Sequence, residues 1–130
     1  MRMKQVSVFI ENRPGRLKKL LEVLAKAEIN IRALSIADTA DFGIVRMILS
    51  DTERGLEAIR TAGFASSTHD VLRAEIPDKP GGLLTAIANP LAAANINLEY
   101  VYAFADHPTE NAMVVLKVDD ISAAEKVLKS

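Results

Sequence analysis

Along this 130-residue chain, the spacing of hydrophobic residues switches between the alternation typical of a strand and the spacing typical of a helix. Residues 4–11 alternate apolar and polar, which predicts a strand with one buried face. Leucines between positions 17 and 24 follow the spacing of a helix buried on one side. Beyond them the pattern predicts strands at 30–38 and 43–50, a short helix starting near Asp51 or Thr52, and a weaker strand at 64–70.

The second half of the chain gives a similar series of predicted elements. Residues 71–76 form a strand, a helix begins near Pro80, strands follow at 97–104 and 111–118, and a last helix carries Ile121, Ala124 and Leu128 on one side. Each half is therefore βαββα, with a fourth strand only in the first half. The predicted domains are a repeat at 1–70 and a repeat at 71–130 whose last strand is missing.

The two halves also share a sequence motif. The stretch "ENRPGRLKKLLEVLAKAEINI" at 11–31 is followed by "PDKPGGLLTAIANPLAAANINL" at 77–98. Gly15 aligns with Gly81, and Asn30 aligns with Asn97, with one extra residue between them in the second copy. Both copies join a Pro-Gly turn to the start of a helix and place an asparagine after its end.

The extra residue has a predicted position. Alignment of the apolar residues places it between Ile87 and Leu91, where Pro90 interrupts the helical pattern. Proline removes a helical hydrogen bond, and an inserted residue is commonly accommodated as a π-bulge or a kink. The second long helix is therefore expected to bend near Asn89.

Composition and charge narrow the classes of function. With 49% hydrophobic residues, 25% charged residues and a formal net charge of -1, the chain is typical of globular proteins and offers no basic surface for nucleic acid. No apolar run reaches the roughly 20 residues of a membrane span. Cysteine is absent, which excludes disulfides and thiolate metal sites and favours a cytoplasmic location.

Residues able to do chemistry are few. His69 and His107 have no acidic or serine partner at an interpretable spacing and are expected to be ordinary surface residues. Asp51 and the pair Asp119 and Asp120 lie at predicted helix starts, where capping explains them. The sequence predicts no catalytic residue, no metal site and no cofactor.

The two Pro-Gly turns are the remaining candidates for binding. Taken alone, such a turn only starts a helix, and an asparagine only ends one. Their repetition favours a functional role, because a glycine-rich turn at a helix N-terminus can receive a carboxylate. Amide and carboxylate side chains nearby can hold an ammonium group, and a ligand with both groups is an amino acid.

From Lys4 to Leu128 the chain resembles the tandem ACT proteins, whose ferredoxin-like βαββαβ modules bind amino acids and regulate metabolic enzymes. The resemblance implies an α+β fold of two ACT-type repeats with antiparallel sheets side by side and helices on one face. It also implies ligands bound where two ACT domains meet. The effector contacts it implies are Asn12, Arg13, Gly15, Asn30, Ile31, Asp78, Lys79, Gly81, Gly82, Leu83, Asn97 and Leu98.

The expected function is thus a non-enzymatic sensor of a free amino acid that regulates a metabolic enzyme. Serine is not implied, because Ile10 stands where serine-inhibited phosphoglycerate dehydrogenases carry a ligand-binding histidine. The second turn is favoured, since Asp78 can pair with an ammonium where Asn12 offers a neutral amide, and its two glycines expose more backbone. Tyr100 and Tyr102 are expected to contact the side chain of a branched or aromatic ligand.

The strand at 97–104 is apolar on both faces, which predicts a homodimer or a higher oligomer. The two repeats are expected to share one sheet, with the missing last strand supplied by a neighbouring chain or left as a protected edge. Two other functions remain open. A ferredoxin-like acyl-phosphate hydrolase would use Arg13 and Asn12, and an RNA-binding βαββαβ domain would use exposed aromatic residues, which only one strand supplies.

Overall fold

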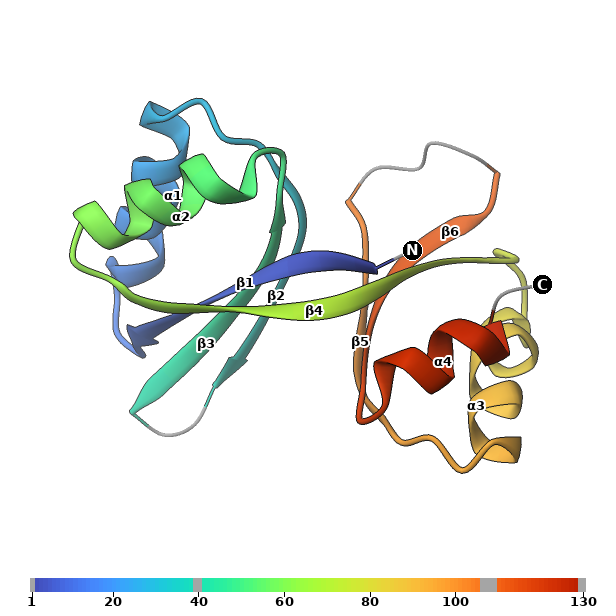
Figure 1. Cartoon of the computed structure of the whole chain (residues 1–130). Helices are drawn as coiled ribbons and strands as arrows, with labels where there is room; N and C mark the ends of the chain where they lie inside the picture. The colour runs from blue at the N-terminus through green and yellow to red at the C-terminus, as the bar shows by residue number, and fades with distance from the viewer. Residues whose placement is uncertain (1, 39–40, 106–109, 129–130) are drawn as a thin grey trace. The chain divides into compact units, whose positions relative to one another are not determined.

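The computed structural model describes residues 2–38, 41–105 and 110–128 (Figure 1). Its helices and strands follow the predicted order, except that one strand, Ala65–Ile76, replaces the two strands predicted at 64–70 and 71–76. The element order is β1 (Arg2–Glu11), α1 (Arg16–Lys26), β2 (Ile31–Asp38), β3 (Phe42–Leu49), α2 (Thr52–Thr61), β4 (Ala65–Ile76), the π-helix η1 (Leu84–Ala88), α3 (Asn89–Ala93), β5 (Leu98–Ala103), β6 (Ala112–Val118) and α4 (Ile121–Leu128).

The strands form a six-stranded sheet in the order β2-β3-β1-β4-β6-β5. The β1-α1-β2-β3-α2-β4 segment with strand order β2-β3-β1-β4 is the ferredoxin-like arrangement, so the predicted α+β fold class is confirmed. The chain divides into two compact units, Lys4–His69 and a second unit made of Met1–Met3 with Asp70–Ser130.

Strand β4 differs from the prediction of two separate strands at 64–70 and 71–76. It is one strand of 12 residues that runs through both units. No proline or glycine lies between Ala65 and Ile76, so nothing in the local sequence ends the strand. The polar stretch at 66–69 suggested a boundary only because it lacks apolar residues.

The missing last strand of the second repeat has its counterpart within the chain itself, so both predicted solutions were wrong. In the sheet, β4 lies between β6 and β1. The N-terminal end of β1 belongs to the second unit, where Arg2 bonds to Glu125 at 2.6 Å and lies 3.8 Å from Asp70. The hydrogen bond with Glu125 raises the pKa of Arg2. Strands β1 and β4 therefore each serve both repeats.

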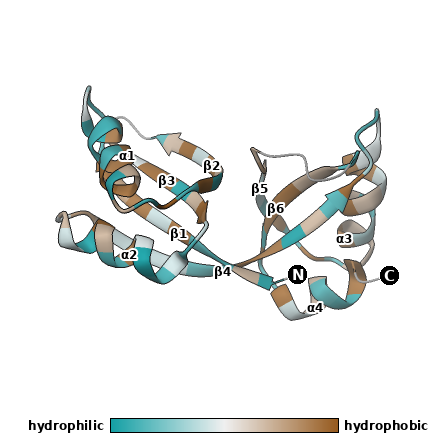
Figure 2. Ribbon diagram, turned by 90° about the horizontal axis from the view of Figure 1, so that it is seen from above, coloured by the Kyte–Doolittle hydropathy of each residue, from teal (hydrophilic) through white to brown (hydrophobic). Residues whose placement is uncertain are grey.

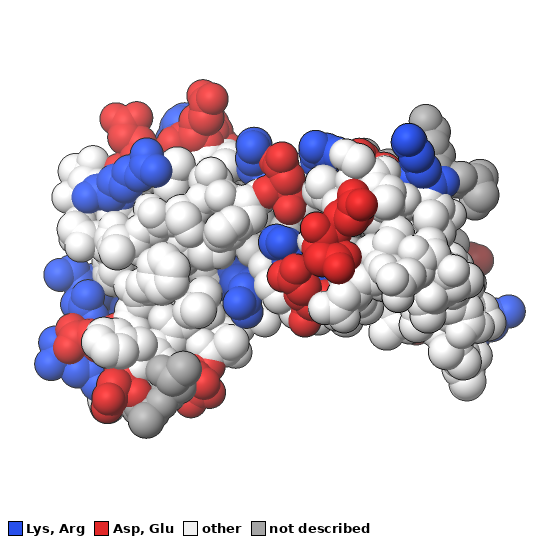
Figure 3. Space-filling view, turned by 60° about the horizontal axis from the view of Figure 1, so that its bottom comes forward, with Lys and Arg blue, Asp and Glu red and all other residues white. Residues whose placement is uncertain are grey.

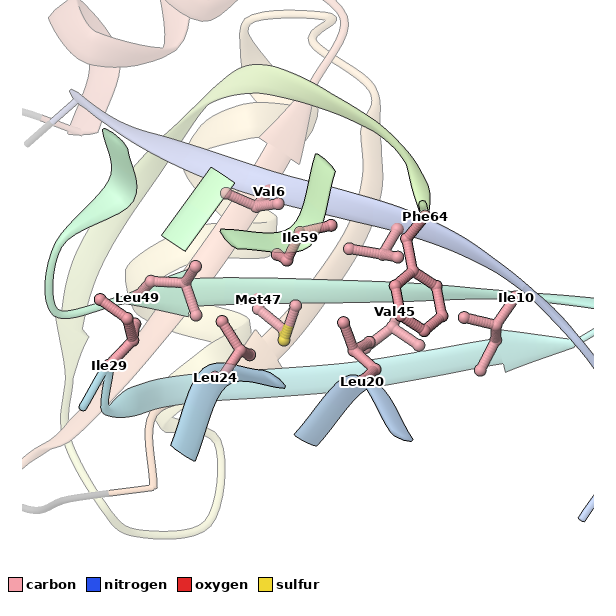
Figure 4. Close-up of a cluster of buried hydrophobic side chains, with 11 residues drawn as sticks. Val6, Ile10, Leu20, Leu24, Ile29, Val45, Met47, Leu49, Ile59 and Phe64 are labelled. Atoms are coloured by element: carbon pink, nitrogen blue, oxygen red, sulfur yellow. The ribbon is translucent and has the colours of Figure 1, made fainter. Parts of the chain in front are cut away.

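The core of the unit Lys4–His69 lies between its strands and helices α1 and α2 (Figure 4). Val6 and Val8 of β1 are opposite Met47 and Val45 of β3, and all four are fully buried. Helix α1 adds Leu20 and Leu24. The complete buried cluster is Val6, Val8, Ile10, Leu20, Leu24, Ile29, Val45, Met47, Leu49, Ile59 and Phe64.

The second unit has an equivalent core beneath η1, α3 and α4. Its buried cluster is Leu72, Ala74, Ile76, Ile87, Leu91, Ile96, Val114, Leu116, Val118 and Ala124. In both units, hydrophobic residues are concentrated on the strands, and α1 turns hydrophilic residues outward (Figure 2). Acidic and basic side chains are interspersed on the face shown in Figure 3.

The extra residue of the second repeat is absorbed as a π-helix, as expected, but earlier than predicted. The Asn89 N–H donates to the Leu84 carbonyl, five residues back. Ile87 and Leu91 are buried as Leu20 and Leu24 are, with a constant offset of 67 residues, so the insertion precedes Ile87. Ile87 therefore corresponds to the buried Leu20 and not to Leu21, which is less buried, so burial rather than residue type gives the alignment.

Asp51 caps α2 as predicted, because its side chain accepts a hydrogen bond of 3.1 Å from the Arg54 N–H. Asp120 accepts from Ala123 in the same way at the start of α4. Asp119 instead accepts from the backbone of Asn97. The capping explanation therefore holds for two of the three predicted positions.

Candidate functional site

The first Pro-Gly turn joins β1 to α1, and neighbouring side chains bind its polar groups. The Arg13 guanidinium lies 3.2 Å from the Glu11 carboxylate, which Arg16 also approaches at 3.8 Å. Asn12 donates its backbone N–H to the Asp41 carbonyl and its side-chain amide to Asp38. Gly15 adopts φ 88° before the helix and is exposed.

The second turn has the same backbone shape and different side-chain surroundings. Gly81 adopts φ 80°, matching Gly15, and the Thr85 N–H and hydroxyl both donate to its carbonyl. Lys79 is exposed and Asp78 is exposed as well. Among the described residues, nothing forms a hydrogen bond or an ion pair with the Asp78 carboxylate, so it does not cap the helix.

Gly82 is buried, in contrast to the expectation that both glycines expose backbone. Its N–H donates to the Lys79 carbonyl at 3.0 Å. A Cβ at this position would lie 2.0 Å from the Pro77 carbonyl oxygen. The absence of a side chain at Gly82 therefore serves close packing, and Arg16 occupies the equivalent position in the first repeat.

The two asparagines lie beyond the helix ends and do not end the helices. Glu28 and Asn95, both with φ 57°, make the left-handed turns that end α1 and α3. The Asn30 N–H donates to the Ser50 hydroxyl at 2.9 Å, and the Asn97 N–H donates to the Asp119 carboxylate at 3.0 Å. These bonds hold the backbone of Asn30 next to the end of β3 and the backbone of Asn97 next to the end of β6.

The asparagine side chains remain open to a ligand. Asn30 and Asn97 are exposed, and within the part of the chain that the structure describes their amides make no hydrogen bond. The residues that follow them, Ile31 and Leu98, are partly buried and pack against the cores of their units. Ile31 and Leu98 could therefore offer a ligand mainly their backbone groups.

Within one repeat, the turn and the asparagine are far apart. Helix α1 has 11 residues between Gly15 and the loop that contains Asn30, a length of roughly 16 Å. Gly15 precedes the helix and Asn30 follows it, so the predicted contacts form two groups at opposite ends. A ligand the size of one amino acid cannot touch both groups of the same repeat.

Tyr100 and Tyr102 share one face of β5, and their contact with a ligand at the second turn stays a prediction. Their rings stack with centroids 6.3 Å apart. Val101, between them, packs against the core beneath the helices, so the tyrosines lie on the opposite face of the sheet. The alternating pattern of residues 97–104 places both rings on one face of the sheet, but it does not show which of the two faces that is.

Two leucines beside the second turn are exposed. Leu83 has 39% and Leu84 has 55% of its surface exposed. Leu83 was a predicted contact, whereas Leu84 was missed. Aligning the two repeats could have revealed Leu84. It corresponds to Lys18 of the first repeat, and a leucine at the position of a surface lysine indicates an apolar surface there.

No group of three or more histidine, acidic or cysteine residues suited to a metal ion occurs in residues 2–38, 41–105 and 110–128. His69 is exposed, and its ring lies 3.3 Å from the Ser67 hydroxyl. His107 lies outside the described residues. None of the described helices is long and apolar enough to cross a membrane.

Comparison with known proteins gives one family. The family model described as an ACT domain pair matches residues 1–130. Among solved structures, protein BT0572 from Bacteroides thetaiotaomicron is 41% identical, with a TM-score of 0.91 over 99% of this chain and 88% of that chain.

The ligand-free regulatory subunit of aspartate kinase from Thermus thermophilus shares the fold at 15% identity, with a TM-score of 0.68 over 99% of this chain and 92% of that chain. The corresponding subunit from Thermus flavus is 17% identical, with a TM-score of 0.69 and the same coverage. The search of curated proteins gives no match.

Proposed function

The chain belongs to the ACT domain pair family, and we propose that it is a non-enzymatic sensor that binds a free amino acid and regulates a metabolic enzyme. The observation that carries this proposal is the repeated turn, in which Gly15 and Gly81 adopt nearly the same left-handed conformation before a helix. Such a turn directs backbone N–H groups toward a carboxylate.

The ligand is proposed to bind between repeats. Because α1 separates Gly15 from Asn30 by roughly 16 Å, a turn from one repeat must combine with an asparagine from another. A second copy of the chain would supply the asparagine. The proposal therefore includes a homodimer or a higher oligomer.

The second turn is the preferred site. In the first turn, Glu11 already neutralises Arg13, and Asp38 accepts from Asn12. In the second turn, the exposed Asp78 has no partner among the described residues and can pair with a ligand ammonium group. Asn97 of another copy supplies the amide, because within one repeat the helix keeps the two apart.

The exposed Leu83 and Leu84 give the second site an apolar surface. A ligand side chain that covers them would gain roughly 25 cal/mol for each Å² of apolar area removed from water. An amino acid with a branched or aromatic side chain is therefore the preferred ligand class. The absence of cysteine supports a cytoplasmic location for the sensor.

Two alternatives have less support. A phosphate cradle of an acyl-phosphate hydrolase would need Arg13 available, and that guanidinium is paired with Glu11 at 3.2 Å. RNA-binding domains of this topology use aromatic residues on central strands, whereas Tyr100 and Tyr102 lie on the edge strand β5. Hydrolysis of acetyl phosphate by the purified protein would support the first alternative.

A thermal-shift screen of the full chain against the twenty amino acids tests the proposal. Ligand at about 100 times its dissociation constant should stabilise the fold by about 2.7 kcal/mol, a rise of several degrees in melting temperature. Asp78→Ala and Asn97→Ala should lose the response, and the matched Asn12→Ala change in the first turn should keep it. A screen without any response, or equal responses in all variants, would refute the proposal.

A further inference from the structure

In both repeats, the backbone of the asparagine that follows the first helix is held by the same pair of hydrogen bonds. In the first repeat, the Asn30 N–H donates to the Ser50 hydroxyl and the Ser50 N–H donates to the Asn30 carbonyl, both at 2.9 Å. In the second repeat, the Asn97 N–H donates to the Asp119 carboxylate at 3.0 Å, and the Asp119 N–H donates to the Asn97 carbonyl at 3.2 Å. Asp119 therefore corresponds to Ser50.

The negative charge of Asp119 is not needed for this backbone connection. The neutral hydroxyl of Ser50 makes the same bond in the first repeat at a similar distance. Asp119 does not cap α4 either, because Asp120 accepts the hydrogen bond from the Ala123 N–H. The charge is thus a difference between the two repeats that these backbone bonds do not explain.

The Asp119 carboxylate is open to a ligand. Its side chain is exposed, and within the described part of the chain it makes no ion pair and no hydrogen bond other than the one from Asn97. The nearest lysine in the sequence, Lys117, pairs with Glu99 instead, at 3.5 Å. A carboxylate beside the exposed side chain of Asn97 is suited to bind a cation.

We propose that Asp119 is a specificity-determining residue that binds the ammonium group of the ligand together with Asn97. This inference rests on the amino-acid binding of the proposed function. Asn97 lies in the loop between α3 and β5, and Asp119 lies in the loop between β6 and α4, so one copy of the chain supplies both (Figure 1). Asp78 comes from the turn of the other copy. The three donors of an ammonium group match the two carboxylates and the Asn97 amide oxygen.

The proposal predicts selectivity for an amino group. A 2-hydroxy acid has the carboxylate and the side chain of the corresponding amino acid, but it carries a neutral hydroxyl in place of the ammonium group. Charge-assisted hydrogen bonds are roughly twice as strong as neutral ones. The wild-type protein should therefore bind the amino acid about tenfold more tightly than the hydroxy acid, or better.

Titration calorimetry of the full chain measures this selectivity. The probe is the amino acid that gives the largest thermal shift among the twenty, and it is compared with the 2-hydroxy acid of the same side chain. For leucine and phenylalanine, which belong to the preferred ligand class, these acids are 2-hydroxy-4-methylpentanoate and 3-phenyllactate. Asp119→Ser copies the first repeat, and Asp119→Asn keeps an oxygen for the Asn97 N–H. Both variants should bind the amino acid about tenfold more weakly and the hydroxy acid as the wild type does.

Asp120→Asn is the matched control, because it removes one negative charge at the next residue. Asparagine caps helices as well as aspartate does, so the start of α4 should be kept. This variant should retain the preference for the amino acid over the hydroxy acid. It separates a contact of Asp119 with the ammonium group from a general effect of charge at this end of α4.

The outcomes separate this inference from the proposed function. Loss of the preference in the Asp119 variants, with its retention in Asp120→Asn, supports the inference. A preference that survives in either Asp119 variant, that Asp120→Asn loses equally, or that the wild type lacks overturns it and leaves amino-acid binding standing. Two Asp119 variants that both fail to fold show that the carboxylate is structural and also overturn it. A wild-type protein that responds to none of the twenty amino acids overturns both.

Discussion

Replacing Gly82 with alanine tests whether this glycine serves packing or ligand access. The added Cβ would lie 2.0 Å from the Pro77 carbonyl oxygen, whereas carbon–oxygen contacts in proteins are about 3.3 Å or longer. Backbone on one side must therefore move by more than about 1 Å. Overpacking of this kind costs about 1–3 kcal/mol, and a backbone obstacle places the cost near 3 kcal/mol.

The matched control is Gly81→Ala, one residue earlier. Gly81 is exposed, and among the described residues no heavy atom lies within 4 Å of the place that an alanine Cβ would take there. Its cost comes from the left-handed backbone alone, about 1 kcal/mol. Gly82→Ala should thus lower the melting temperature by about 12 °C and Gly81→Ala by about 4 °C.

Thermal and urea unfolding of the three proteins would measure the difference. The urea midpoint should fall in the same order, with an unchanged slope, because the native fold is kept. A Gly82→Ala protein as stable as the wild type, or more stable than Gly81→Ala, would refute the packing explanation. In that case the glycine pair would again be best explained by access of a ligand to the backbone.

Three further changes have expected outcomes. Asp51→Ala removes the cap that holds the Arg54 N–H and should cost about 1 kcal/mol in urea unfolding. Leu24→Ala empties a fully buried position and should cost about 3–5 kcal/mol, measured in the same way. Arg2→Ala removes the exposed pair with Glu125, and its effect on melting temperature should shrink as salt is raised from about 50 mM to about 1 M. A salt-independent effect of Arg2→Ala would show that the pair acts through packing.

Most of the fold could be predicted because hydrophobic periodicity reports burial. The leucines of α1 and the alternation around Val8 mark faces that meet in one core. Sharing of β1 and β4 between repeats could not be predicted in this way. It depends on pairing between Arg2 and residues more than 60 positions away, and such pairing leaves no local pattern in the sequence.

The exposure of the candidate residues was predictable where it depends on residue type. Asp78 and Asn97 are exposed polar residues beside a turn and a helix end, as their chemistry suggested. The burial of Gly82 and the sheet face of Tyr100 could not be predicted, because one depends on a neighbouring carbonyl and the other on which sheet face meets the helices. Both are properties of the folded chain.

The contacts of Arg2 have a consequence for synthesis of the chain. Arg2 hydrogen-bonds to Ser122 and Glu125, which are 120 and 123 residues away. The ribosome makes Arg2 long before its partners in α4, which emerge only after that whole stretch has been made. The N-terminal end of β1 can therefore complete these contacts only after the C-terminal repeat has been made.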